Sequence, residues 1–130
     1  MFDGSKAFAS FSVDDVTNAK AFYGEKLGLK IKDGGMGNLN VELGAGSVMI
    51  YPKGKAHQPA SFTVLNFPVP DLERAVDQLA KKGIRMKRYE MEGMKADEKG
   101  IYRDKDNGMG IAWFEDPAGN VLSVMEMPER

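Results

Sequence analysis

The sequence predicts an α+β fold made of two tandem βαβββ modules. Three observations support this: an internal repeat, a helix start signal in each copy of the repeat, and a change to two-residue periodicity after each helix. In the repeat, SVDDVTNAKAFYGEKLGLKIK at 12–32 lies over PVPDLERAVDQLAKKGIRMKR at 68–88, a spacing of 56 residues. Self-similarity at a fixed spacing indicates a duplicated structural unit.

The start signal in each copy is an aspartate, Asp15 or Asp71, at the end of a short run of alternating apolar residues. Its carboxylate can accept hydrogen bonds from the free N–H groups of a helix's first turn. Apolar residues then recur at spacings of three and four, which predicts two amphipathic helices of about three turns. Gly28 and Gly83 stand at the expected C-terminal ends, where a left-handed backbone favours glycine.

After each helix the apolar residues alternate, which is typical of strands. The predicted strands are 29–33, 38–43 and 47–52 in the first copy, and 85–92, 108–116 and 120–127 in the second. A four-stranded sheet covered on one face by one helix leaves its other face bare, so we expect the two copies to shield each other. We therefore predict one domain over 1–130, with module one at about 6–53 and module two at about 60–127.

The second copy contains an additional segment, 93–109, which is rich in charge and glycine. Two interpretations are open: a solvated loop, or a flap over a binding site.

The charge balance excludes several function classes. Eighteen basic and nineteen acidic side chains give a formal net charge of -1, so no positive field draws the chain to nucleic acid or anionic lipid. Because the sequence has no cysteine, thiol chemistry and disulfides are excluded. The N-terminal residues lack a targeting pattern, so we expect a cytoplasmic protein with neither nucleic-acid nor membrane partners.

Two motifs resemble a known superfamily. The pattern V-D-D-V...A-x-x-F-Y...L-G from Val13 to Gly28, and F-x-D-P-x-G-N-x-L from Phe114 to Leu122, are similar to those of the vicinal oxygen chelate superfamily. Its members include glyoxalase I, bleomycin-resistance proteins and extradiol dioxygenases. The resemblance runs from about Lys6 to Met127. It implies curved mixed sheets around a cavity, with the helices outside.

The resemblance also implies where a metal would bind. Metalloenzymes of this superfamily hold a divalent ion through His or Gln on the first strand of each module and Glu on the last. The matching positions here are Phe8, Val64, Ile50 and Ser123. Three of these have no lone pair to donate, and one serine hydroxyl is a poor ligand for a divalent cation. We expect no metal at the usual place, and no cofactor.

Strand alternation then predicts the lining of the cavity. The candidate ligand-cavity residues are Phe8, Ser10, Ile50, Val64, Asn66, Trp113, Ser123 and Met125. Trp113 is the only tryptophan; it could offer a stacking plane, as aromatic residues do in the metal-free bleomycin-resistance proteins that the chain resembles, or belong to the core. In the alternative, Phe8, Met49, Met125 and Trp113 fill the cavity as ordinary core.

Other polar residues are interpreted as surface groups. His57, the only histidine, lies in the loop between the modules, where we expect it to be solvated. Candidate acid–base carboxylates occur only at positions where an outward orientation is the simpler expectation. They are Glu42, Glu90, Glu92, Glu115 and Glu126. Glu90 and Glu92 could raise each other's pKa if both were buried.

These observations lead to a first hypothesis: metal-independent binding of a small organic molecule in the cleft between the modules, by a homodimer. The alternative is a glyoxalase-like lyase, isomerase or dioxygenase whose metal is held by non-standard ligands such as Glu42, Glu90 or His57. A third is an accessory subunit with a filled cavity. No catalytic residue is assigned.

Overall fold

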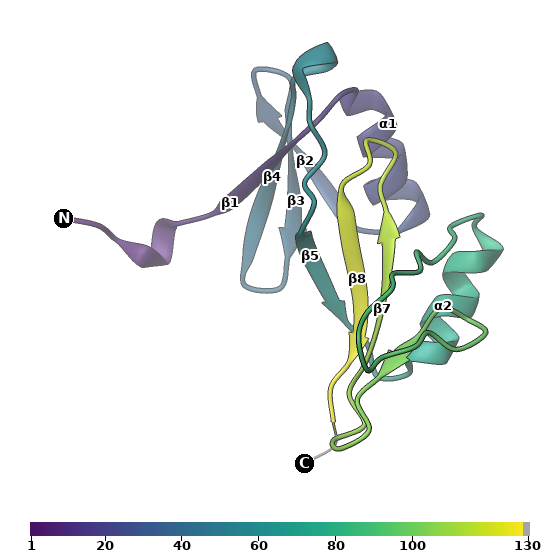
Figure 1. Cartoon of the computed structure of the whole chain (residues 1–130). Helices are drawn as coiled ribbons and strands as arrows, with labels where there is room; N and C mark the ends of the chain where they lie inside the picture. Colours follow the sequence, from purple (N-terminus) through teal and green to yellow (C-terminus); the bar gives the residue numbers. More distant parts are fainter. Residues whose placement is uncertain (129–130) are drawn as a thin grey trace. The chain divides into compact units, whose positions relative to one another are not determined.

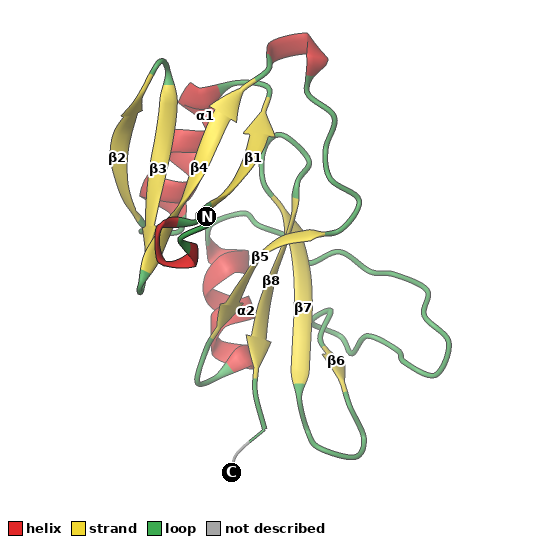
Figure 2. Cartoon of the chain, turned by 90° about the vertical axis from the view of Figure 1, so that its left-hand side faces the viewer, coloured by secondary structure: helices red, strands yellow, loops and turns green. Residues whose placement is uncertain are grey.

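A computed structural model describes residues 1–128 of the chain (Figure 1). The chain divides into two compact units, unit 1 from Met1 to Pro59 and unit 2 from Ala60 onward. Each unit is a four-stranded mixed sheet with a helix on one face, in the strand orders β1-β4-β3-β2 and β5-β8-β7-β6 (Figure 2). This confirms the α+β class and the twice-repeated βαβββ order.

Unit 1 contains β1 (Ala9–Val13), α1 (Val16–Lys20), the π-helical η2 (Ala21–Lys26), β2 (Lys30–Gly35), β3 (Asn38–Leu43) and β4 (Gly46–Pro52). Two short 3-10 turns flank the sheet, η1 (Gly4–Lys6) and η3 (Gly54–Ala56). β1 pairs parallel with β4, and the other pairs are antiparallel. Unit 1 thus has the predicted element order.

The first helix begins at the predicted cap. The Asp15 carboxylate accepts from the backbone N–H of Thr17 at 2.8 Å and of Asn18 at 3.2 Å. The helix then widens to π geometry, a change in pitch that the sequence pattern did not predict. As a result the adjacent side chains Phe22 and Tyr23 are both buried, with their rings edge to face.

Unit 2 contains β5 (Thr63–Pro68), α2 (Leu72–Lys81), β6 (Tyr102–Arg103), β7 (Gly110–Glu115) and β8 (Val121–Glu126). α2 lies across one face of this sheet (Figure 2). Alternate strand residues Phe114, Leu122 and Val124 are buried on that side, and the apolar stripe of α2 is buried against them. This helix–sheet contact is the core of unit 2.

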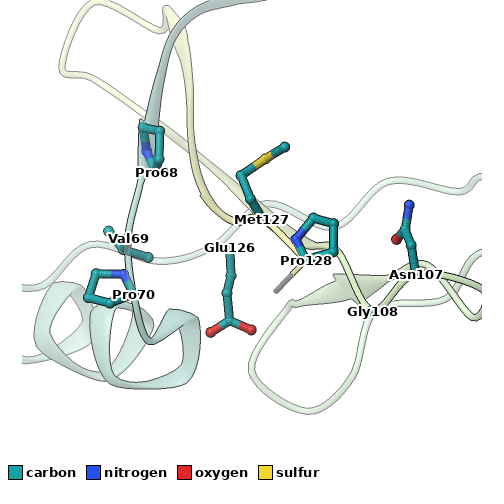
Figure 3. A pocket seen from close by; sticks show the side chains of 8 residues that line it. All are labelled: Pro68, Val69, Pro70, Asn107, Gly108, Glu126, Met127 and Pro128. Carbon is teal, nitrogen blue, oxygen red and sulfur yellow. The ribbon is translucent and has the colours of Figure 1, made fainter. Parts of the chain in front are cut away.

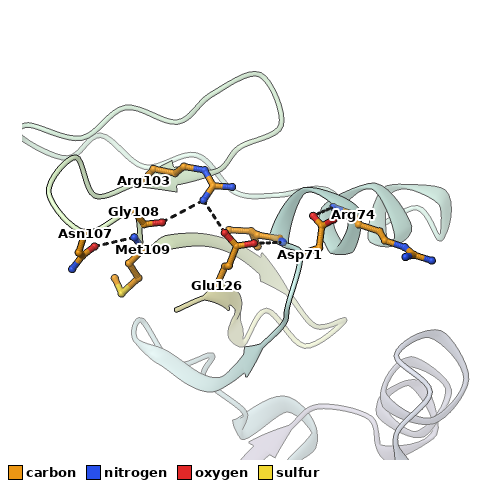
Figure 4. A network of polar contacts seen from close by, with 8 residues as sticks. Asp71, Arg74, Arg103, Asn107, Gly108, Met109 and Glu126 are labelled. Atoms are coloured by element: carbon orange, nitrogen blue, oxygen red, sulfur yellow. Dashed lines mark hydrogen bonds and ion pairs between the residues drawn. The ribbon is translucent and has the colours of Figure 1, made fainter. Parts of the chain in front are cut away.

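Two carboxylates accept hydrogen bonds from backbone N–H groups at the N-terminus of α2 (Figure 4). Asp71 accepts from the N–H of Arg74 at 3.1 Å, and Glu126 at the end of β8 accepts from the N–H of Leu72 at 3.1 Å. The second carboxylate oxygen of Glu126 receives the Arg103 guanidinium at 3.1 Å. Glu126 therefore joins the last strand to the helix and to β6, a role that sequence alternation did not predict.

The prediction of a strand at 85–92 was wrong. This segment has only isolated bridges, from Lys87 to Trp113 and from Met91 to Met94. The strand that pairs with β7 is β6, through Tyr102 and Arg103. Ile101 and Tyr102 are each 1% exposed, so burial of two large apolar side chains holds β6 in the sheet. Part of the predicted loop 93–109 is therefore strand.

Within the predicted loop 93–109, the stretch 97–101 is bonded to α2 and to the segment that follows it. Lys99 forms an ion pair with Asp77 of α2 at 2.9 Å. Arg88 donates to the carbonyl oxygens of Asp97 and Glu98 at 2.9 and 2.8 Å. The stretch 97–101 is thus fastened near α2, an arrangement that does not support its interpretation as a flap over the opposite sheet face.

Among residues 1–128, no helix is both long enough and apolar enough to cross a membrane.

Candidate functional site

A row of three side chains crosses the sheet of unit 2 on the face away from α2, here called the non-helix face. Ser123 is in register with Asn66 on one side and with Trp113 on the other. Residues in register on neighbouring strands point to the same face. The row therefore brings together an amide, a hydroxyl and an indole that the sequence analysis had assigned to one cavity wall.

Hydrogen bonds hold this row in place. The Ser123 hydroxyl, which is fully buried, donates to Oδ1 of Asn66 at 2.6 Å. The Trp113 indole N–H donates to Oγ1 of Thr63 at 3.0 Å. A bulge between Thr63 and Leu65 puts Thr63 opposite Val121 and so on the same face as Ser123. Alternation alone could not reveal Thr63, because the bulge changes the parity of β5.

Two tyrosines complete an aromatic cluster around Trp113. Tyr89 and Tyr102 contact the indole with ring centroids 5.6 and 5.4 Å away, both steeply tilted. The Tyr102 hydroxyl donates to the carbonyl of Tyr89 at 2.8 Å and accepts from its N–H at 2.5 Å. Burial raises the pKa of the Tyr89 phenol, although Lys87 acts in the opposite direction. Trp113 is half-buried, so it belongs to this packed cluster and also reaches the surface.

The non-helix face of unit 1 is mainly polar. Its register rows contain mostly hydroxyl and amide groups, with one thioether; these residues are Ser10, Ser12, Asn40, Ser47, Met49 and Tyr51. The Asn38 amide donates to the Met49 sulfur at 3.6 Å. At the far edge Glu42 forms ion pairs with Lys32 at 2.7 Å and Lys30 at 3.6 Å. The hydrogen bond from Lys32 lowers the pKa of Glu42.

His57 is not the freely solvated residue that the sequence predicted. It is half-buried, and its Nδ1 lies 2.8 Å from the Ser12 hydroxyl. The short turn η3 returns the chain toward the end of β1, where the backbone N–H of Lys53 donates to the carbonyl of Val13 at 2.8 Å. The contact depends on this turn. Because the turn has no residue periodicity, the sequence analysis could not predict the contact.

The prediction that Ile50 lines the cavity was wrong. Ile50 is in register with Phe11 and fully buried, and Phe11 contacts Tyr23 on the helix side. Asn66 pairs with Ser123 in unit 2, and its repeat counterpart Ser10 pairs with Met49 in unit 1. The counterpart of Ser123 is therefore Met49, one residue before Ile50, which the sequence analysis had matched to the superfamily's ligand position.

Of the other predicted cavity residues, Ser10, Asn66 and Met125 are in register with Met49, Ser123 and Pro68, whereas Val64 falls in the β5 bulge and has no register partner. Ser10 and Asn66 are exposed, and Val64 and Met125 are half-buried. Phe8 precedes β1 and is 62% exposed, so it does not fill a core as the alternative required.

The candidate carboxylates do not gather into an acid–base or metal centre. Glu115 is paired with Lys87 at 3.4 Å, while Glu90 and Glu92 are both exposed and so are not buried together. Within residues 1–128, no group of three His, Cys, Asp or Glu side chains is placed to hold a metal ion. The superfamily's donor set does not fit this chain, because Phe8, Met49, Val64 and Ser123 supply neither carboxylate nor imidazole.

Three surface clefts lie within single units, and none of the three includes a predicted cavity residue. The cleft in Figure 3, about 710 Å³, lies at the ends of β5 and β8. Its lining is Pro68, Val69, Pro70, Asn107, Gly108, Glu126, Met127 and Pro128. A second, about 790 Å³, lies beside α2, and a third, about 410 Å³, beside α1. Both carboxylate oxygens of Glu126 already accept hydrogen bonds, from Arg103 and from α2. This carboxylate is therefore not available to a ligand in the first cleft.

Comparison with known proteins shows the family. Residues 7–124 match the model of the Glyoxalase/Bleomycin resistance protein/Dioxygenase superfamily. The chain belongs to this superfamily, which confirms the resemblance drawn from the two sequence motifs. No curated protein sequence matches the chain significantly.

Solved structures share the fold at low identity. An integron cassette protein from the Halifax Harbour sewage outfall metagenome is 19% identical with a TM-score of 0.71, over 92% of this chain and 96% of that one. A putative glyoxalase family protein from Bacillus anthracis is 20% identical with a TM-score of 0.68, over 98% and 99%. Lactoylglutathione lyase from Agrobacterium tumefaciens is 17% identical with a TM-score of 0.65, over 96% and 95%. These likenesses show the fold alone.

Proposed function

We propose that the protein binds a small organic molecule without a metal, on the non-helix face of the unit 2 sheet. The observation that carries the proposal is the row Asn66–Ser123–Trp113, where the superfamily's metalloenzymes would have a carboxylate at position 123. An aromatic plane beside an amide and a hydroxyl is the combination that binds flat, partly polar ligands.

The hydrogen bonds within the row support specificity. Since the Ser123 hydroxyl donates to Oδ1 of Asn66, the Asn66 amide group is oriented with its N–H donors available to a ligand acceptor. The Trp113 N–H is used by Thr63, so the indole would contribute its ring surface and no hydrogen bond to a ligand. The face therefore favours a planar ligand with a hydrogen-bond acceptor at one edge.

A compound screen tests the proposal. Protein purified with a chelator is heated with antibiotics, including bleomycin-type glycopeptides, and with common metabolites. A bound compound raises the melting temperature and changes the fluorescence of Trp113, the only tryptophan. Asn66→Ala should weaken binding by about tenfold, which is the loss of about one good hydrogen bond. Asn18→Ala, an exposed asparagine on α1, is the matched control.

Three results would count against the proposal. These are a panel with no stabilising compound, binding that depends on an added divalent metal, and equal binding by the Asn66→Ala and Asn18→Ala variants.

We also propose that the protein is a homodimer, as modules of this superfamily commonly assemble around a two-fold axis. Light scattering at micromolar concentration should give a mass of twice 14.3 kDa. A mass of one chain would contradict this.

A further inference from the structure

The cleft beside α2 has a more basic lining than the chain as a whole. It has a volume of about 790 Å³ and lies between the helix, the segment that follows the helix, and residues 98–99. Four basic and two acidic side chains line it; these are Arg85, Lys87, Arg88 and Lys99, with Asp77 and Glu98. In the whole chain, nineteen acidic side chains outnumber eighteen basic ones. Positive charge is therefore concentrated in this cleft.

Two of the four basic groups are already paired with carboxylates. Lys99 forms its ion pair with Asp77 at 2.9 Å, and Lys87 forms one with Glu115 at 3.4 Å. These two lysines therefore contribute little net charge to a ligand.

The two arginines keep both charge and hydrogen-bond donors. Arg85 is exposed and, within residues 1–128, has no hydrogen-bond or ion-pair partner. Arg88 donates to the backbone carbonyl oxygens of Asp97 and Glu98, which are neutral acceptors. A guanidinium has five N–H donors, so Arg88 retains its full charge and further donors. Glu98 is the one acidic group of the lining outside an ion pair in the described chain, so the unpaired charge of the cleft is positive.

Stabilisation of the helix end does not explain these arginines. Cations are favoured in the last turn of a helix by its dipole, and Lys81 and Lys82 lie at that position in α2. The effect falls off within one turn, and Arg85 and Arg88 lie beyond it in the chain. Arg88 has a structural contact with 97–98, whereas Arg85 has none in the described fold.

The same cleft also offers apolar contact. Val76 and Ile84 are buried, Met86 is half-buried, and all three line the cleft. A phosphate ester combines a group of nearly two negative charges with an organic part. Its phosphate oxygens match the forked donors of arginine, and charge-assisted bonds of this kind are stronger than neutral ones. Such a ligand fits two unpaired guanidinium groups beside an apolar surface.

We propose that the cleft beside α2 binds a small organic phosphate, with its phosphate group held by Arg85 and Arg88 and its organic part against Ile84 and Met86. This is a second binding site, because its lining shares no residue with the row Asn66–Ser123–Trp113. The inference does not depend on the proposed function.

Nuclear magnetic resonance tests the proposal, with phenyl phosphate and phenol as probes. The two probes share a ring and differ in the phosphate group. Phenyl phosphate should shift the amide signals of Gly83 and Lys99, which line the cleft, in a saturable way. Phenol should leave these signals unchanged, and inorganic phosphate should bind more weakly than phenyl phosphate because it lacks the organic part.

Arginine variants test the assignment to this cleft. Affinity for phenyl phosphate should fall by about tenfold or more in Arg85→Gln, the loss expected for a hydrogen bond to a charged group. Its melting temperature should not change, because Arg85 has no partner in the described fold. Arg74→Gln is the matched control: it removes the same charge from an exposed arginine of α2 outside the cleft, and it should bind as the unsubstituted protein does.

Several outcomes would overturn the proposal. These are equal shifts with phenyl phosphate and phenol, no shift with either, and equal affinities of Arg85→Gln and Arg74→Gln for phenyl phosphate. A short oligonucleotide that displaces phenyl phosphate at a lower concentration would assign the cleft to nucleic acid and overturn a small-molecule ligand.

Discussion

Gly100 and Met86 lie in such close contact that a Cβ on Gly100 would be 2.7 Å from the Cβ of Met86. Gly100 also has a φ of +87°, which side chains other than glycine rarely adopt. This contact packs the stretch 97–101 against the segment that follows α2.

Gly100→Ala should therefore destabilise the protein by about 2 kcal/mol or more, from backbone strain and overpacking together. Urea unfolding measures the loss. Met86→Ala should not rescue the variant, because the closest atom of Met86 is its own Cβ. Gly44→Ala, where the added Cβ meets nothing within 4 Å, is the control and should be close to neutral. Equal stability of the two glycine variants would contradict the contact.

The backbone conformation at the tip of the β2–β3 hairpin allows a stabilising substitution to be predicted. Met36 has a φ of +53° and Gly37 a φ of +79°, so both turn residues are left-handed. Asparagine tolerates this backbone better than methionine, whose side chain is 98% exposed and makes little packing contact. Met36→Asn should stabilise the protein by about 1 kcal/mol. Thermal unfolding tests this, and Met36→Val should lower the melting temperature instead.

Two substitutions at Ser123 test whether this position contributes a hydrogen bond and whether it can hold a metal ligand. Ser123→Ala should cost about 1 kcal/mol, because one hydrogen bond is lost and its partner Asn66 is exposed enough to meet water. Ser123→Glu should cost about 3 kcal/mol or more, since it buries an unpaired carboxylate. Denaturant unfolding with and without Ni²⁺ compares the two. Recovery of Ser123→Glu stability by the metal would show that a metal site can be rebuilt here.

The two helix caps should contribute unequally. Asp15 accepts hydrogen bonds from two backbone N–H groups of α1. At α2, Asp71 and Glu126 each accept one hydrogen bond from a backbone N–H group. Asp15→Ala should therefore cost about 1 kcal/mol, and Asp71→Ala somewhat less. Urea unfolding of each variant measures the costs, and Asp14→Ala is a control at the neighbouring aspartate. A larger loss for Asp71→Ala would contradict the shared cap.

Glu42 should make unit 1 slightly sensitive to acid. Its pKa is lowered in the folded state, so its contribution is complete above the unfolded pKa and is lost as pH falls through the folded pKa. Carboxyl NMR titration should show that Lys32→Met raises the Glu42 pKa toward its ordinary value. Because the pair is solvent-exposed, high salt should reduce this difference. An unchanged Glu42 pKa in Lys32→Met would contradict the ion pair.

The sequence by itself determined the features that depend on local chemistry. The repeat, the caps at Asp15 and Asp71, and the alternation in 38–43 and 120–127 all report residues near one another in the chain. These signals were sufficient for the βαβββ order, the family, and the absence of carboxylate or imidazole at the superfamily's ligand positions.

Only the tertiary structure decided which side chains meet. The bulge in β5 brought Thr63 to Trp113, and the register of β1 with β4 put Met49, not Ile50, opposite Ser10. The turn after β4 brought His57 to Ser12, and Tyr102 and Arg103, outside the predicted strand 85–92, paired with β7 as β6. Each of these outcomes depends on a one-residue shift or on a contact between distant segments. Local periodicity is the same for either outcome, so packing and hydrogen bonding across the sheets select between them.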